Sequence, residues 1–159
     1  MVKTLSVTSI LFCGAIFGFF YAWVCSTMWG LDAADPRVAI AAMQAMNASV
    51  RNAVFFPAFF LTPAVLGITA IAAGLRNSWG AASLFGAAAV IYLVFGLALT
   101  LAVNVPMNEA LAAVAIPTDI EAARAIWQDY SVRWQFWNQI RAGASGLALA
   151  FAATALARL

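Results

Sequence analysis

Four long apolar segments constrain this chain more than any other feature. They cover about residues 5–29, 53–74, 81–103 and 140–156. Each is close to the ~20 residues that a helix needs to cross the hydrocarbon layer of a bilayer. The chain is 65% hydrophobic and only 9% charged, whereas soluble domains carry about 25% charged residues. We therefore predict an all-α fold, a four-helix transmembrane bundle that forms one integral membrane domain over residues 1–159.

Two of the three connections between these segments are long and have helical patterns. We expect one amphipathic helix over about residues 36–51, where Pro36 suits a first helical position, and another over about 119–139. The second follows a capping-box pattern, Thr118-x-x-Glu121, and no Gly or Pro interrupts it before the fourth apolar segment. With an even number of spans, both connector helices lie on one membrane face and both termini on the other.

The composition also excludes several classes of function. The chain contains no histidine, which excludes His-ligated haem, the common His-based metal sites and a histidine general base. The net charge is only +2, without a basic run, so nucleic acid is not an expected partner. Neither a phosphate-binding loop nor a dinucleotide-binding glycine pattern is present. We predict neither a metal nor a cofactor.

The third apolar segment ends in a cluster of amides. Asn104 and Asn108 flank Pro106, which removes a backbone donor, so we expect the helix to end or kink there. One interpretation is that the two amides cap the helix terminus. The other is that they face a cavity between helices, where broken backbone is tolerated at membrane depth.

A second polar cluster enters the last apolar segment. Trp127, Tyr130, Trp134, Asn138 and Arg141 are spaced by three and four residues, so they form one stripe along a helix. For the tryptophans we favour an aromatic belt at the membrane interface. For Asn138 and Arg141 we favour the interior of the bundle, because a charge at membrane depth is costly without a partner.

The partner of Arg141 is left open among Glu109, Asp32 and the amides of Asn104 and Asn108.

A third group of polar side chains lies on one face of the first connector helix: Gln44, Asn47 and Arg51. The default interpretation of that face is a solvated surface. The alternative is that the helix covers the mouth of the bundle as a lid and turns these side chains inwards.

These pieces occur in an order that resembles the anthrone oxygenase-like family of small four-span membrane proteins. The resemblance rests on Phe20-Tyr21-Ala22-Trp23, Met28 to Leu31, Met43-Gln44-x-x-Asn47, Asn104-Val105-Pro106-Met107-Asn108 and Trp134-x-x-x-Asn138-x-x-Arg141. It implies that the polar residues of interest are Asn47, Asn104, Pro106, Asn108, Trp134, Asn138 and Arg141. Fungal oxygenases of this family convert anthrones to anthraquinones with O₂ and no evident cofactor.

Such a reaction needs a base, a group that stabilises an oxyanion, and a flat apolar slot. Because histidine is absent, the base must be Glu109 or Asp129. Arg141 and the asparagine amides would stabilise the anion, and Trp127 and Trp134 would form the slot. We therefore predict two catalytic residues, Glu109 and Arg141, and five substrate-binding residues: Asn47, Asn104, Asn108, Trp134 and Asn138.

Two other functions remain open at this point. The chain can be a non-catalytic accessory subunit or small-ligand-binding membrane protein, in association with a companion membrane subunit or as a homo-oligomer. A small transporter is disfavoured, because no apolar segment carries an acid in its middle. The expected surroundings are the lipid bilayer of a bacterial plasma membrane and a lipophilic small-molecule ligand. Lys3, Arg76 and Arg158 flank the face of the termini, which favours a cytoplasmic position for it.

Overall fold

The computed structural model describes residues 1–159, and its regular structure is entirely helical. The N-terminal rod consists of α1 (Val2–Ala22), a π-helical segment η1 (Trp23–Thr27) and α2 (Met28–Asp32). The third rod consists of α5 (Trp79–Ile91), the π-helical segments η2 (Tyr92–Ala98) and η3 (Thr100–Asn104), and α6 (Val105–Ala112). The remaining helices are α3 (Pro36–Ser49), α4 (Phe55–Gly74) and α7 (Ile120–Leu156).

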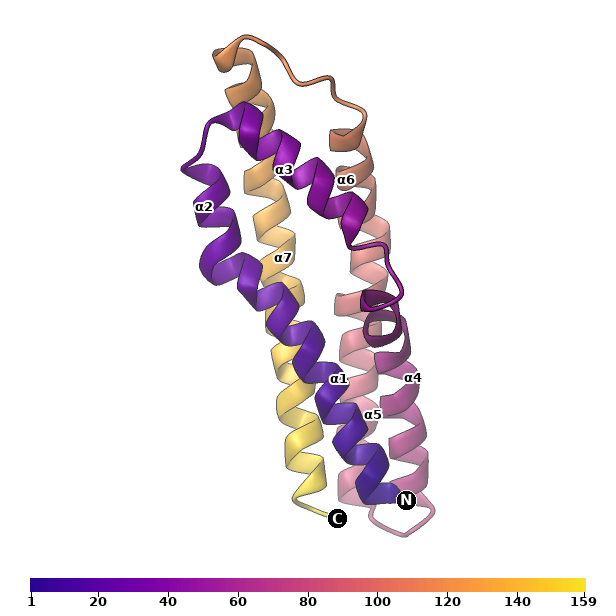
Figure 1. Cartoon of the computed structure of the whole chain (residues 1–159). Coiled ribbons are helices and arrows are strands. Elements are labelled where there is room, and N and C mark those ends of the chain that lie inside the picture. Colours follow the sequence, from indigo (N-terminus) through magenta and orange to yellow (C-terminus); the bar gives the residue numbers. More distant parts are fainter.

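Four helices form an antiparallel bundle in which each packs against two neighbours. Helix α1 contacts α4 and α7, and α5 contacts the same two helices from the other side. Figure 1 shows both termini and the α4–α5 turn at one end of this bundle. That turn places Asn77 at φ 59°, a left-handed conformation that asparagine tolerates better than most residues. Alanines of α7, such as Ala148 and Ala152, are fully buried and let the helices approach closely.

Three of the rods are long and apolar enough to cross a membrane. They are Val2–Asp32, Phe55–Gly74 and Trp79–Ala112. The predictions of an all-helical fold and of helices that can span a membrane are thus confirmed. The predicted fourth span lies in the C-terminal half of α7, which also carries Arg141 and packs against α1 and α5.

The third rod does not end at Pro106, contrary to the prediction of a terminus there. Helical structure continues to Ala112. The two π-helical segments come immediately before α6, and Pro106 falls in the first turn of α6. In a first turn the missing N–H of a proline removes no α-helical hydrogen bond, so the rod passes through this position.

Helix α7 is one uninterrupted helix of 37 residues, as the absence of Gly and Pro before the last apolar segment indicated. Its N-cap is Asp119 rather than Thr118, because the Asp119 carboxylate accepts the N–H of Ala122 at 2.8 Å. The belt interpretation of its tryptophans is wrong. Trp127 and Trp134 are both only 4% exposed and face the interior.

Helix α3 crosses the end of the bundle that lies away from the termini, where it packs on α6 and α7 (Figure 1). Asp35 caps its first turn by accepting the Arg37 N–H at 2.9 Å. The Arg37 side chain, which donates to the same carboxylate, lowers the pKa of Asp35 to about 2.

The polar face of α3 is turned towards the bundle. Gln44 Nε2 donates to the carbonyls of Leu111 and Val114 at 2.9 and 3.0 Å. The solvated-face interpretation is therefore wrong for Gln44 and Asn47, which turn inwards as the lid interpretation expects, whereas Arg51 stays exposed.

Candidate functional site

The covered end of the bundle contains a cavity of about 870 Å³. Its walls come from α1, η1, α4, η3, α6 and α7, and the end of α3 with the following loop covers it. Six of the seven predicted site residues line it: Asn47, Asn108, Glu109, Trp134, Asn138 and Arg141. These residues belong to three separate helices, α3, α6 and α7, and the fold brings them to one space.

Aromatic side chains form most of the apolar wall. The rings of Trp23 and Trp134 lie 5.1 Å apart between centroids, and those of Phe19 and Phe55 lie 4.7 Å apart. Phe59, which is stacked on Phe55, extends this wall along α4. Rings held in this way form a slot that suits a flat apolar ligand.

Arg141 is the cation of this cavity, and it is only 4% exposed. Its guanidinium donates to Asn138 Oδ1 at 3.0 Å and to Thr100 Oγ1 at 3.3 Å, while its Nε has no partner. The guanidinium carbon lies 4.6 Å from the ring centre of Phe20 and 5.2 Å from that of Trp134. None of the partners left open by the sequence binds it, and it takes part in no ion pair. Arg141 is thus a buried charge with neutral neighbours only.

Asn138 connects Arg141 to the opposite helix. Its Nδ2 donates to the carbonyl of Phe20 at 3.1 Å, while its Oδ1 accepts from the guanidinium. The side chain is 1% exposed. Because both ends of the amide are bound, Asn138 fixes the orientation of the guanidinium and joins α7 to α1.

Asn108 is the second polar anchor of the cavity. Its Oδ1 accepts from Tyr130 Oη at 2.8 Å and from Trp134 Nε1 at 2.9 Å. Burial raises the pKa of Tyr130, so its hydroxyl stays protonated and can donate. Asn47 Nδ2 lies 3.4 Å from the same hydroxyl. Since both donors use its oxygen, Asn108 retains an Nδ2 that makes no hydrogen bond within the protein.

Glu109 lies at the outer rim of the cavity, where it is exposed and pairs with Arg51 at 3.4 Å. It is the one carboxylate among the lining residues. Asp129, the other base allowed by the sequence, lies outside the cavity and pairs with Arg133 on the surface of α7. The geometry therefore leaves Glu109 as the single carboxylate that can reach a ligand. No group of three or more Cys, Asp and Glu side chains is arranged to hold a metal ion.

Asn104 is fully buried but does not line the cavity. Neither its Oδ1 nor its Nδ2 has a hydrogen-bond partner. Its predicted contact with a substrate is not part of this arrangement. A buried amide without partners costs free energy, and Asn104 is the one predicted site residue for which the structure offers no polar neighbour.

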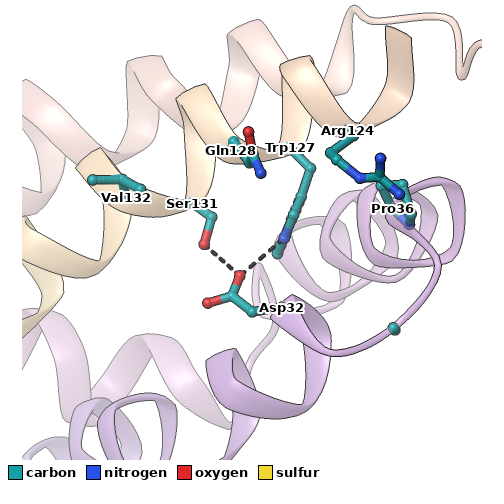
Figure 2. A pocket seen from close by; sticks show the side chains of 8 residues that line it. Asp32, Pro36, Arg124, Trp127, Gln128, Ser131 and Val132 are labelled. Carbon is teal, nitrogen blue, oxygen red and sulfur yellow. Dashed lines mark hydrogen bonds between the residues drawn. The ribbon is translucent and has the colours of Figure 1, made fainter. Parts of the chain in front are cut away.

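Asp32 is not a partner of Arg141, although the sequence left that open. Figure 2 shows its Oδ1 between Trp127 Nε1 and Ser131 Oγ, at 2.9 and 2.7 Å. Its Oδ2 accepts from Gln135 Nε2 at 2.8 Å. These three donors belong to α7, so the carboxylate fastens the end of α2 to that helix. It positions the wall of the cavity from outside and does not contact its interior.

The profile of the anthrone oxygenase family matches residues 46–151. This is about two thirds of the chain. The chain belongs to the anthrone oxygenase family. No curated protein and no solved structure matches it.

The family match contains every predicted site residue, from Asn47 to Arg141. The rings of Phe20 and Trp23 lie before its first residue, in the part of the N-terminal rod that completes the cavity. The predicted site residues are therefore within the region that the family profile covers, and one aromatic wall is outside it.

Sequence reasoning missed two parts of the site. Thr100, which holds the Arg141 guanidinium, is four residues before Asn104 and eight before Asn108, so the spacing of the amides could have found it. The phenylalanines at the start of α4 occur in the run Phe55-Phe56-Pro57-Ala58-Phe59-Phe60. In a chain this apolar such a run has no distinctive signal, because lipid-facing and cavity-facing rings look alike.

Proposed function

We propose that this protein catalyses the cofactor-independent oxidation of a lipophilic aromatic compound of the anthrone type by O₂ in the cavity. The single observation that carries the proposal is Arg141, a buried cation without an anion at the end of an aromatic slot. Family membership supports the same reaction class. A buried charge without a counter-ion destabilises a protein, so its position beside a cavity favours a ligand that brings the negative charge.

The reaction starts with removal of a proton from the benzylic carbon of the anthrone. The electron pair of the broken C–H bond moves into the ring system and places negative charge on the carbonyl oxygen at the opposite edge of the central ring. Arg141 stabilises this oxyanion, and Glu109 is the carboxylate available to accept the proton. The acidic carbon and the carbonyl oxygen thus require groups at two ends of one cavity.

The anion then reduces O₂, and the benzylic carbon forms a bond to oxygen. Loss of water from the resulting peroxide converts the CH₂ group to a second carbonyl. One oxygen atom enters the anthraquinone and the other leaves in water, so anthrone and O₂ balance quinone and water. The electron-rich anion is the reductant, and no metal or flavin enters this scheme. The aromatic walls hold the ring system flat and exclude bulk water.

We also propose that all four bundle helices cross the plasma membrane of a bacterium, with both termini in the cytoplasm. The support is that α7 packs along α1 and α5 as the other spans do. Lys3, Arg76 and Arg158 flank the end of the bundle that carries the termini.

The direct test is oxygen consumption by the purified protein in detergent with an anthrone, together with formation of the anthraquinone. We expect a rate above the detergent blank, and a rate reduced at least tenfold in Glu109→Gln. The matched control is Asp129→Gln, an exposed acid outside the cavity, which should retain the wild-type rate. No consumption above the blank would remove this reaction for anthrones.

A further inference from the structure

The cavity has two different rims. At its outer end the exposed lining residues include three polar side chains, those of Arg51, Asn52 and Glu109, with Val54 beside them. Along its side the exposed lining residues are apolar. Phe56 is 40% exposed, Phe60 42% and Leu101 48%. The polar side chains of the first rim favour contact with water, and the apolar side chains of the second favour contact with the hydrocarbon of the bilayer.

The apolar rim lies between two helices that diverge. Helix α4 packs on α5 and on η2. Nearer its N-terminal end it carries Phe56 and Phe60, which line the cavity, as Leu101 of η3 does from the third rod. The side of the cavity between α4 and η3 is therefore bordered by partly exposed apolar side chains and not by packed helix contacts.

The apolar rim and the Arg141 guanidinium lie at a similar distance from the face of the termini. At 1.5 Å per residue, Phe60 lies roughly 21 Å along α4 from Gly74, and Phe56 roughly 27 Å. On α7, Arg141 lies roughly 22 Å from Leu156. Because α4 and α7 both end at the face of the termini (Figure 1), Phe60 and Arg141 are at a similar level. That level is inside a hydrocarbon layer about 30 Å thick.

We infer that the ligand reaches the cavity sideways from the bilayer, between Phe56 and Phe60 of α4 and Leu101 of η3. An uncharged phenolic aromatic compound dissolves in the hydrocarbon and meets this opening at the depth of Arg141. The hydroxyl or carbonyl oxygen moves inwards to the guanidinium, and the ring system follows into the aromatic slot. The Arg51–Glu109 pair at the outer rim stays on the aqueous side. The class of ligand rests on the proposed function, whereas the route rests on the two rims.

The test uses lipid nanodiscs with the Cys25→Ser protein and with variants of it that each carry one introduced cysteine. Cys25 is replaced because it is exposed, and Cys13 is kept because it is buried. The probe is 1,8-dihydroxyanthraquinone, and its association is followed by quenching of tryptophan fluorescence in a stopped-flow instrument. Leu101→Cys is labelled with the bulky, uncharged reagent N-cyclohexylmaleimide. Leu93→Cys is the matched control, because Leu93 is 47% exposed on the same rod but does not line the cavity.

We expect the adduct at Leu101→Cys to slow association of the probe at least tenfold, and the adduct at Leu93→Cys to change it less than twofold. An adduct at Asn52→Cys, on the polar rim, should also change it less than twofold. Phe56→Cys blocks the same opening from α4, so the result does not depend on one variant folding correctly.

The opposite pattern overturns the inference: a slow step with the adduct at position 52 and none with adducts at positions 56 and 101 would show a route from water. A Cys25→Ser protein that does not bind the probe also overturns it. Since association is measured without turnover, the two proposals fail separately. A blocked side opening in a protein that oxidises no anthrone keeps the route and removes the reaction. Unaffected association in a protein that does oxidise anthrone keeps the reaction and removes the route.

Discussion

At Arg141, every interaction of the guanidinium is with a neutral group. Two side-chain oxygens accept from it, and two aromatic rings lie against it. The rings contribute cation–π attraction, but neutral groups alone do not offset the cost of removing a charge from water. The residue is thus better explained by a ligand than by the stability of the ligand-free bundle.

The first prediction concerns this residue. In Arg141→Met the free energy of unfolding without ligand should change by less than about 2 kcal/mol, because the lost hydrogen bonds are offset by removal of an uncompensated charge. Binding of 1,8-dihydroxyanthraquinone, measured as a rise in melting temperature in detergent, should disappear. Arg133→Met, an exposed arginine of the same helix, should keep that rise. A rise retained in Arg141→Met would show that the ligand does not contact the guanidinium.

The hydroxyl of Tyr92 compensates for a hydrogen bond that Pro63 removes from the backbone of α4. Pro63 lies inside α4 and has no N–H, so the carbonyl of Phe59, four residues earlier, loses its helical donor. The hydroxyl of Tyr92, a fully buried residue, donates to that carbonyl at 2.8 Å. One side chain of the third rod thus repairs the backbone of α4 beside the cavity.

The second prediction follows from this pair. Tyr92→Phe should lower the free energy of unfolding by about 1–3 kcal/mol, because the Phe59 carbonyl is left unsatisfied. In a Pro63→Ala background an amide donor returns, and the same substitution should have a smaller effect. Chemical denaturation of the four proteins gives the coupling energy. Equal effects in both backgrounds would show that the proline is not the reason for the hydrogen bond.

At the scale of elements, the π-helical part of the third rod forms around a glycine. A Cβ built on Gly96 would lie 2.7 Å from the ring of Tyr92, closer than side chains tolerate. The third prediction is that Gly96→Ala destabilises the protein by about 1–3 kcal/mol, because the Tyr92 ring must move. Gly86→Ala on α5 is the control, since nothing lies within 4 Å of its Cβ position. Thermal melts should rank the control at or above wild type, and equal melts for both variants would contradict the account.

Elements differed in how far the sequence could predict them. The continuous α7 followed from the absence of Gly and Pro, and Pro36 placed the start of α3. The π-helical segments had no signal, because their residues have no composition or spacing that distinguishes them from an apolar α-helix. The lid position of α3 was also undecided, since a polar face looks the same towards water and towards backbone carbonyls such as that of Leu111.

For the site, the spacing of polar residues, the family resemblance and the absence of histidine together predicted six of the lining residues. It did not predict their partners. Arg141 was expected to meet a carboxylate or an amide of the third rod, but Thr100 and two rings occupy those positions. Which side chains meet across a bundle depends on helix rotation and depth, and a single sequence of this composition defines neither closely.

For the whole molecule, the bundle places the termini and the α4–α5 turn together and the loop between α6 and α7 at the other end (Figure 1). The fourth prediction is that Asn77→Cys and a cysteine added after Leu159 react with an impermeant thiol reagent from one side of the membrane. Ile116→Cys should react from the other side. Labelling of spheroplasts and inverted vesicles, in the Cys25→Ser background, measures this. Opposite sides for positions 77 and 159 would show that α7 does not cross.

The most direct measurement of the central claim is the ionisation of a phenol inside the cavity. The absorbance of bound 1,8-dihydroxyanthraquinone reports its protonation during a pH titration. Because a cation stabilises the phenolate, binding to the wild-type protein should lower the pKa of the probe relative to the probe in vesicles, and affinity should rise with pH up to the pKa of the unbound probe. In Arg141→Met the pKa should not be lowered. A probe that binds the wild type with an unchanged or raised pKa would contradict the assignment of Arg141 as the partner of an anion.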